Sequence, residues 1–152
     1  MLSVSDTSPL TGLIQIGQAE LLPRLFGRIV VPPAVHSELS QIHPVLPSWL
    51  EVLDPGPISV SLQSSGLHRG ETEGIALALR LKASVLLIDE QHGRQVALAH
   101  GLRITGLLGI LILAKSRGLV PVVEPLIREL RSTAGCRFAD ALVAQVLREV
   151  GE

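Results

Sequence analysis

The stretch from Glu71 to Gly101, ETEGIALALRLKASVLLIDEQHGRQVALAHG, predicts the fold class of the chain. Its first part, through Lys82, is apolar nearly all round a helical repeat, which predicts a deeply buried helix. Ser84–Asp89 is a short apolar run typical of a buried central strand. Glu90–His100 is helical again and ends at the glycine. This order indicates an α/β domain with a central parallel sheet flanked by helices.

The rest of the chain continues the same alternation of short strands and helices. Strands are expected at Leu2–Ser5, Arg28–Val31 and Arg103–Thr105, and short edge strands at Glu51–Leu53 and Ile58–Leu62. The other helices are expected from Pro9, with Ser8 as N-cap, and over Glu20–Phe26, Ala34–Ser40, Leu107–Arg117, Pro121–Arg131 and Phe138–Val150. No repeat or composition change interrupts this order, so residues 1–152 are expected to form a single domain.

Composition narrows the classes of function. Hydrophobic residues make up 47% of the 152 residues and aromatic residues only 2%, so the core must be aliphatic. So few aromatic side chains speak against a nucleic-acid platform built by base stacking. Thirteen Lys and Arg against fourteen Asp and Glu give a net charge of −1, without a global basic field. The single cysteine excludes a disulfide within the chain and speaks against a cysteine-based zinc site.

Targeting signals are not evident in this sequence. The first residues have neither a basic segment nor the long apolar segment of a secretory signal. The most apolar run, Leu107–Ala114, is too short to span a bilayer. We therefore expect a cytoplasmic protein that does not associate with membranes.

Two acidic residues follow predicted strands directly. Asp6 comes after the first strand and Asp89 after the buried central strand. In open parallel sheets, ligands bind at the carboxyl ends of the strands, so both carboxylates are expected at one functional edge. The alternative is that each side chain only caps the helix that follows. The residues alone leave both interpretations open.

Three glutamates are further candidates for the same edge. Glu38 neighbours the buried stripe of its helix, which Val35 and Leu39 define, and points either toward a cleft or into solvent. Glu71 and Glu73 open the buried helix, where the helix dipole alone favours acidic residues. Because that helix is buried, a carboxylate at its start is expected near the edge of the sheet.

Several of these segments, taken in order, resemble one family of proteins. The carrying motifs are VSDTSPL at 4–10, VPPAVHSEL at 31–39, GETEGIALA at 70–78, LIDE at 87–90, and the later Gly93-Arg94, Gly101-Leu102 and Gly106-Leu107-Leu108-Gly109. Together they resemble the PIN-domain family of VapC-like ribonuclease toxins, in a poorly characterised branch. The resemblance extends over nearly the whole chain.

The resemblance implies a PIN-like three-layer fold and an acidic pocket that binds Mg²⁺ or Mn²⁺ and hydrolyses RNA phosphodiester bonds. Asp6, Glu38 and Asp89 match three acids of the family motif. The fourth acid opens the preceding helix, where Glu71 is preferred and Glu73 is the alternative. The commoner family pattern has Asp at that helix, so this chain departs from it there.

The resemblance also implies partners and substrate contacts. Family members are often homodimeric toxins silenced by a small antitoxin protein, and the apolar run Leu107–Ala114 is a candidate dimer surface. Thr7 or Ser8 matches a hydroxyl residue that orients the first acid. Ser8 is also a candidate for contact with the RNA. Closeness in sequence to Glu71 and Asp89, rather than the resemblance, makes Arg69, Arg94 and either His68 or His92 further candidates.

Elementary electrostatics supports this interpretation independently. Carboxylates that converge in one pocket repel each other, and burial raises their pKa, so a hard divalent cation relieves the repulsion. Such a cation also activates water and screens a phosphate. One alternative is a PIN-like protein-binding module with a degenerate, inactive pocket. Another is a phosphohydrolase acting on small phosphates, although its usual Asp-x-Asp start is missing because Ser8 occupies the second position.

Overall fold

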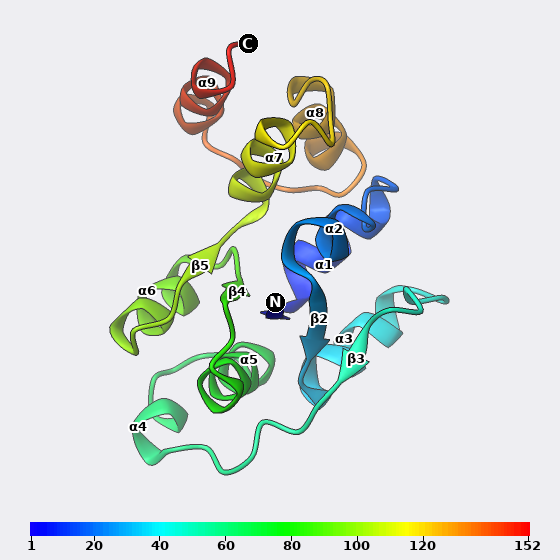
Figure 1. The fold of residues 1–152 in the computed structure, drawn as a ribbon. Coiled ribbons are helices and arrows are strands. Elements are labelled where there is room, and N and C mark those ends of the chain that lie inside the picture. Colours follow the sequence, from blue (N-terminus) through cyan, green and yellow to red (C-terminus); the bar gives the residue numbers. More distant parts are fainter.

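Five parallel strands form the centre of the molecule, in the order β3-β2-β1-β4-β5 (Figure 1). The structure is a computed structural model that describes all residues from Met1 to Glu152. The strands are β1 (Leu2–Ser5), β2 (Arg28–Val31), β3 (Glu51–Val52), β4 (Val85–Leu87) and β5 (Ile104–Thr105). All four pairings are parallel, which confirms the predicted α/β class.

The chain order places a switch point beside β1. From β1 the chain adds β2 and β3 on one side, then crosses to add β4 and β5 on the other. Ser5 pairs with Leu87, and the backbone N–H of Asp6 donates to the carbonyl of Leu87 at 2.8 Å. The residues that follow β1 and β4 therefore leave the sheet together at its carboxyl edge, where α/β proteins bind ligands.

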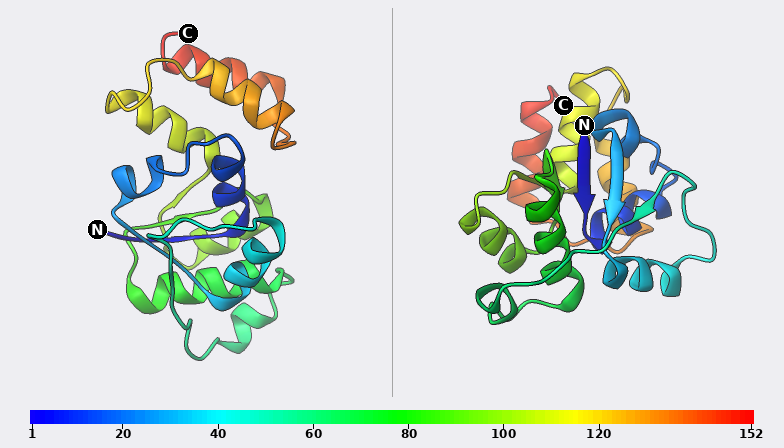
Figure 2. Two further views of the ribbon diagram at one scale, coloured as in Figure 1. Left: turned by 90° about the vertical axis from the view of Figure 1, so that its right-hand side faces the viewer. Right: turned by 60° about the horizontal axis from the view of Figure 1, so that its bottom comes forward.

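Helices cover both faces of the sheet and extend beyond one end of it (Figure 2). They are α1 (Thr7–Gln15), α2 (Leu21–Phe26), α3 (Pro33–Ile42), α4 (Val60–Gln63), α5 (Arg69–Leu81), α6 (Gln91–Ala99), α7 (Leu107–Ser116), α8 (Glu124–Ser132) and α9 (Asp140–Glu149). In Figure 1, α7, α8 and α9 lie at the end of the molecule opposite α4 and α5.

The alternation of side chains along and just after β4 contributes to two cores. Leu87 points into a cluster of 22 buried apolar residues shared with α1, α2 and α7 to α9. Leu86 and Ile88 point the other way, into a cluster of 10 shared with α5 and α6. Successive residues of a strand face opposite sides of the sheet, so one short run supplies both layers. This arrangement confirms the three-layer fold.

Two local predictions were wrong. Ile58–Leu62 is not a strand, because Ser59 accepts a hydrogen bond from the N–H of Leu62 and caps the short helix α4. Ser8 is not the N-cap of the first helix either. Asp6 occupies that position, since the strand pairing continues through its N–H and the helix begins at once. Pro9 is then the third helical residue, where its missing N–H removes no intrahelical bond.

Other elements agree within a few residues. The short edge strand near Glu51 forms β3, whereas α8 and α9 begin three and two residues later than Pro121 and Phe138, the residues expected to start them. The segment 133–139 is therefore not helical and connects α8 to α9. None of the helices combines the length and the apolar character needed to cross a bilayer.

Helix α7 does not support the dimer surface that its apolar sequence suggested. Leu107, Ile110, Leu111 and Ala114 are buried, and the neighbouring apolar side chains pack against the same core. The helix is apolar on several sides because it contacts both α2 and α9. No large, exposed apolar side chain of the molecule lies on α7. The apolar side chains of α7 therefore pack within this molecule.

Candidate metal centre

Asp6 lies at the centre of the candidate site, between the end of β1 and the start of α1. Its side chain is only 6% exposed and makes no capping hydrogen bond to its helix. The pKa of the Asp6 carboxyl is raised from 3.8 to about 7, mainly by burial and also by the charges of three acids, while a hydrogen bond from the Thr7 backbone lowers it. The three acids are Glu71, Glu38 and Asp89. The three residues that repel Asp6 are the other acids of the predicted site.

Glu71 is the buried acid that α5 contributes. Its Oε1 atom accepts the backbone N–H of His68 at 3.1 Å, which anchors the carboxyl group in the first turn of the helix. Its Oε2 atom is buried and has no hydrogen-bond partner. Burial and the charge of the neighbouring Glu90 carboxylate raise the pKa of Glu71 above its usual value, against the lowering effect of the His68 hydrogen bond. A buried, unpartnered carboxylate oxygen is costly unless a proton or a cation meets it.

Asp89 presents a second oxygen of this kind. Its Oδ1 atom accepts the backbone N–H of Leu107 at 2.9 Å, so the start of α7 fixes the side chain. Its Oδ2 atom is buried and unpartnered. Burial raises the pKa of Asp89, while the Leu107 hydrogen bond and the nearby Arg94 guanidinium lower it. Asp89 therefore resembles Glu71 in having one anchored and one free oxygen.

Glu38 reaches the site from α3 and is anchored by a hydroxyl group. The side chain of Thr7 donates to Oε2 of Glu38 at 2.8 Å. The expected orienting hydroxyl is thus Thr7, but it orients Glu38 rather than the first acid. Ser8 is exposed and makes no side-chain hydrogen bond. Its contribution to substrate binding remains a prediction.

Glu73 has a different environment from Glu71, although the two residues lie two positions apart. Oε1 of Glu73 accepts the backbone N–H of Ala34 at 3.0 Å, and Oε2 accepts Nε of Arg69 at 2.9 Å. Both oxygens are therefore occupied by the protein. Glu73 fastens α5 to the start of α3, and Glu71 is the acid with a free oxygen.

Three of the four acids lie against glycines at helix N-termini. A Cβ atom on Gly70 would lie 2.6 Å from Oε1 of Glu38, and one on Gly106 would lie 2.5 Å from Oδ1 of Asp89. A Cβ atom on Gly93 would lie 2.8 Å from Oε2 of Glu71. These glycines open the starts of α5, α7 and α6, whose dipoles favour negative charge. The sequence analysis used these glycines only as parts of the motifs that carry the family resemblance, and it missed this role.

A fifth acid, Glu90, borders the same site and was not predicted. It caps α6, with its Oε2 atom accepting the backbone N–H of Gly93 at 2.7 Å. That hydrogen bond and the charge of His92 lower the pKa of Glu90, although burial opposes them. Glu90 is exposed, and its charge acts on the neighbouring Glu71 carboxyl group. The only sequence signal was its position immediately after Asp89.

The acids fit a hard divalent cation in chemistry, but they do not form a complete coordination set. Carboxylate oxygens are the donors that Mg²⁺ and Mn²⁺ prefer, and two of them are buried without partners. No three acidic, histidine or cysteine side chains are close enough together to hold a metal ion. Protein hydrogen bonds to Glu38, Glu71 and Asp89 each hold one oxygen, and mutual repulsion opposes closer approach. Metal binding would therefore require small side-chain movements.

The predicted cationic contacts differ in where they lie. Arg94 is half-buried, donates from Nη1 to the carbonyl of Ile88 at 2.9 Å, and lines a groove beside Asp89. Arg69 is 84% exposed and pairs with Glu73, so it lies away from that groove. His92 contacts the carbonyl of Ser65 at 2.7 Å, and exposed His68 precedes α5. Arg94 is thus the predicted arginine that the structure places beside an acid of the site.

Comparison with known proteins agrees with this architecture. A family model described as a PIN domain matches residues 2–152. No curated protein and no solved structure matches the chain. PIN domains are generally nucleases that use divalent metals. Because the family model covers nearly every residue, the chain belongs to the PIN-domain family.

Proposed function

We propose that the protein is a metal-dependent endoribonuclease in which Asp6, Glu38, Glu71 and Asp89 hold Mg²⁺ or Mn²⁺. The observation that supports it most is the pair of buried, unpartnered oxygens, Oε2 of Glu71 and Oδ2 of Asp89. They belong to residues whose charges raise the pKa of Asp6 at the same edge of the sheet. A buried group of like charges is expected where a cation compensates them.

The chain's own residues account for the positioning that such a reaction needs. Thr7 holds Glu38, and the N-termini of α5 and α7 hold Glu71 and Asp89, each with an oxygen left for a ligand. When bound, a divalent cation supplies Lewis-acid activation of water and of the phosphate. Asp6 is expected to lose its proton on cation binding, since the opposite charge lowers its pKa.

We also propose the finer setting that the family implies. The protein would act in the cytoplasm as the toxin of a toxin–antitoxin pair, as a homodimer and with a small antitoxin as partner. Family membership supports this part of the proposal.

RNA cleavage with controlled metal content tests the activity. The wild-type protein is expected to cleave a labelled RNA with Mn²⁺ or Mg²⁺ and to lose activity in EDTA. Asp89→Asn should reduce the rate by about 100-fold or more, because a ligand and an anchored charge are lost. Cleavage of small phosphate esters but not RNA would identify a phosphohydrolase instead.

One observation favours the alternative of a protein-binding module with an inactive pocket. The acids do not form a three-ligand group without movement. Titration calorimetry with Mn²⁺ separates the two functions, because a degenerate pocket is expected to give no saturable heat. In that case Asp6→Asn would also leave the cellular effects of the protein intact.

The contrast between Glu71 and Glu73 gives a sharper test. Glu71→Gln is expected to weaken Mn²⁺ binding and RNA cleavage at least tenfold, because it neutralises the acid with the free oxygen. Glu73→Gln should keep both activities and instead lower stability by about 1–3 kcal/mol, because it weakens the contacts to Ala34 and Arg69. Calorimetry and thermal unfolding measure both effects. The reverse pattern would assign the pocket acid to Glu73.

A further inference from the structure

A large groove extends from the acidic site toward the C-terminal helix. Its volume is about 930 Å³, and Thr7 and Asp89 line the end of it that belongs to the site. One wall comes from α1 and from the start of α7, and the opposite wall from segment 134–139 and α9. The groove is therefore continuous with the residues proposed to bind the metal.

Two side chains of the C-terminal wall are suited to a nucleic-acid strand. Arg137 is exposed, lines the groove, and makes no side-chain hydrogen bond or ion pair. Phe138 is half-buried and is the only aromatic residue in the groove lining. The other aromatic residues are engaged elsewhere, since Phe26 is in the core and Trp49 donates to Glu20. One free cation and one half-buried ring, which also packs against the apolar core, thus adjoin in the groove lining.

The wall that carries these residues is fastened to the rest of the fold. The guanidinium of Arg131 donates to the carbonyl of Phe138 at 2.8 Å and to Asp140 at 3.1 Å. At the far end of α9, Lys115 donates to the carbonyl of Val150 at 2.7 Å and to the Glu152 carboxylate at 2.8 Å. A fixed wall can position a strand relative to the acids without ordering a loop first.

Two arginines of the groove lie at different distances from the acidic site. Arg94 lies beside Asp89, and both side chains line the groove. Arg137 lines the same groove from segment 134–139. A strand with one phosphate at the acids could therefore place neighbouring phosphates near Arg94 and Arg137.

From this arrangement we infer that Arg137 and Phe138 form a substrate-positioning subsite for single-stranded RNA. Arg137 contacts a phosphate adjacent to the scissile one, and Phe138 stacks on a neighbouring base. The inference rests on the proposed ribonuclease function. Base stacking on one ring requires an unpaired base, so the groove selects single strands over duplexes.

The test measures RNA binding separately from cleavage. Fluorescence anisotropy with a labelled ten-nucleotide single strand is measured in the Asp6→Asn background, which prevents cleavage. Arg137→Ala is expected to weaken binding about 5- to 10-fold. It should also reduce the slope of log affinity against log salt concentration by about 1, as expected for the loss of one phosphate contact. Phe138→Leu keeps an apolar side chain and should weaken binding about 5-fold through loss of stacking. A duplex of the same sequence should bind alike to all variants.

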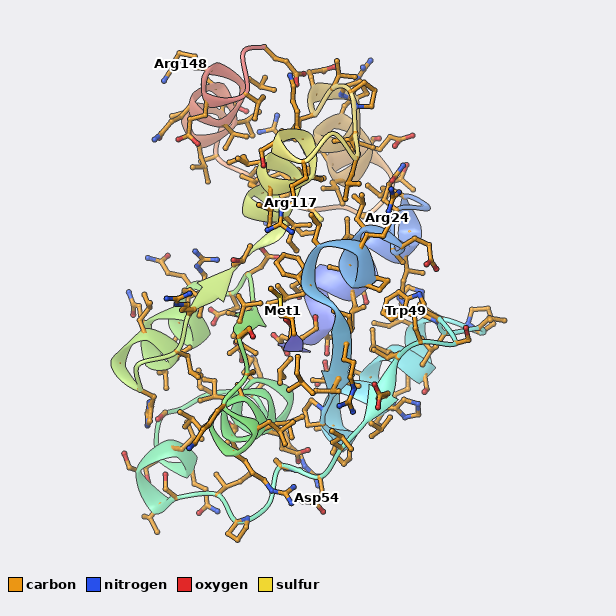
Figure 3. All side chains as sticks on the ribbon, viewed as in Figure 1. Met1, Arg24, Trp49, Asp54, Arg117 and Arg148 are labelled. Atoms are coloured by element: carbon orange, nitrogen blue, oxygen red, sulfur yellow. The ribbon has the colours of Figure 1, made fainter.

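Arg148→Ala is the matched control. Arg148 is exposed on α9 but does not line the groove, and Figure 3 shows it on the outside of that helix. Its removal changes net charge as much as Arg137→Ala does, and should leave binding within twofold. Equal losses for the two arginines would overturn the subsite and leave only non-specific charge attraction. Unchanged binding in both would overturn it as well and favour a protein partner for the groove.

Cleavage by the wild-type protein separates this inference from the proposed function. If Mn²⁺-dependent RNA cleavage occurs but the Arg137 and Phe138 variants bind and cleave normally, the ribonuclease stands and the subsite fails. If the wild-type protein cleaves no RNA, the proposed function fails, whatever the binding assay shows. Thermal unfolding of each variant confirms that the fold is kept.

Discussion

Asp6→Asn is expected to abolish RNA cleavage and, at the same time, to stabilise the metal-free protein at pH 8. A loss of activity together with a gain in stability is expected where the substituted residue belongs to a buried group of repelling charges. Asp6 is only 6% exposed and faces the charges of three other acids. Asparagine keeps the shape of the side chain and removes the charge.

The sign follows from proton binding in the two states. The pKa of Asp6 is about 7 in the folded protein, against 3.8 for an unperturbed group. Between these values the folded state holds a proton that the unfolded state has lost, so stability falls as pH rises. The loss begins near pH 4 and is complete above pH 7, where it amounts to at most about 4 kcal/mol at 1.36 kcal/mol per pKa unit. Below pH 4 Asp6 is protonated in both the folded and the unfolded state, so it does not make the stability depend on pH.

Thermal or urea unfolding between pH 4 and pH 8 measures this effect. The metal-free wild-type protein should lose stability over that range more steeply than Asp6→Asn does. Adding Mn²⁺ at pH 8 should raise the stability of the wild-type protein and leave that of the variant unchanged, because a ligand that binds only the folded state stabilises it. A variant less stable than the wild-type protein at pH 8 would mean that Asp6 is not repelled by its neighbours.

Asp140→Asn provides the control for this experiment. The Asp140 side chain is fully exposed and pairs with Arg131 at the surface. Surface pairs contribute little, so stability should change by no more than about 0.5 kcal/mol and show no added pH slope. A similar gain in both variants would indicate an effect of overall charge.

The strand ends of the site were predictable from the sequence because they depend on short-range patterns. The apolar run before Asp89 marked a buried strand, and the equivalent run before Asp6 marked its parallel neighbour. Parallel strands share a carboxyl edge, so the meeting of the two acids followed from the fold class alone. The residues alone had made Glu38, Glu71 and Glu73 further candidates, and the family resemblance then favoured Glu38 and Glu71.

The choice between Glu71 and Glu73 depended on contacts that no local pattern contains. The partner that occupies Glu73 is the N–H of Ala34, which is 39 positions away in the chain. The same applies to Thr7, whose hydroxyl group orients a glutamate 31 positions away. Such contacts become visible only when the helices are packed, which explains why the orienting hydroxyl was assigned to the wrong acid.

The sequence also did not predict that glycines leave space for the carboxylates of the site, although their positions in the motifs were known. Gly70, Gly93 and Gly106 all occur in the motifs that carry the family resemblance. The sequence shows that small residues lie there, but not that a carboxylate from another element occupies the space of the missing Cβ atom. Which atom lies against a glycine depends on the tertiary structure and is not visible in the local sequence.

Gly93→Ala and Gly74→Ala are therefore expected to have opposite effects. A Cβ atom on Gly93 would lie 2.7 Å from Cδ1 of Ile88 and 2.8 Å from Oε2 of Glu71, both of them in buried side chains. The Glu71 carboxyl must move, so Mn²⁺ affinity and RNA cleavage should fall at least about tenfold. The Ile88 contact adds about 1–3 kcal/mol of overpacking, which exceeds the gain of about 1 kcal/mol in helix propensity.

Gly74→Ala makes the same chemical change in a neighbouring helix without the collision. The nearest atom to its Cβ would be Cδ1 of Leu86 at 3.9 Å, an ordinary contact. The variant should gain about 0.5–1 kcal/mol in stability and keep its Mn²⁺ affinity. Unfolding midpoints and Mn²⁺ calorimetry on both variants separate a general helix effect from a local one.

A double substitution decides whether Gly93 acts through Glu71. In Glu71→Gln the free oxygen has already lost its charge, so adding Gly93→Ala should lower Mn²⁺ affinity by little more. Residues that act on the same contact are non-additive, whereas independent sites add. Full additivity would show that Gly93 shapes the site through Ile88 or the backbone of α6. A Gly93→Ala variant that binds Mn²⁺ like the wild-type protein would remove Glu71 from the metal centre, because its displaced carboxyl would have no effect on the ion.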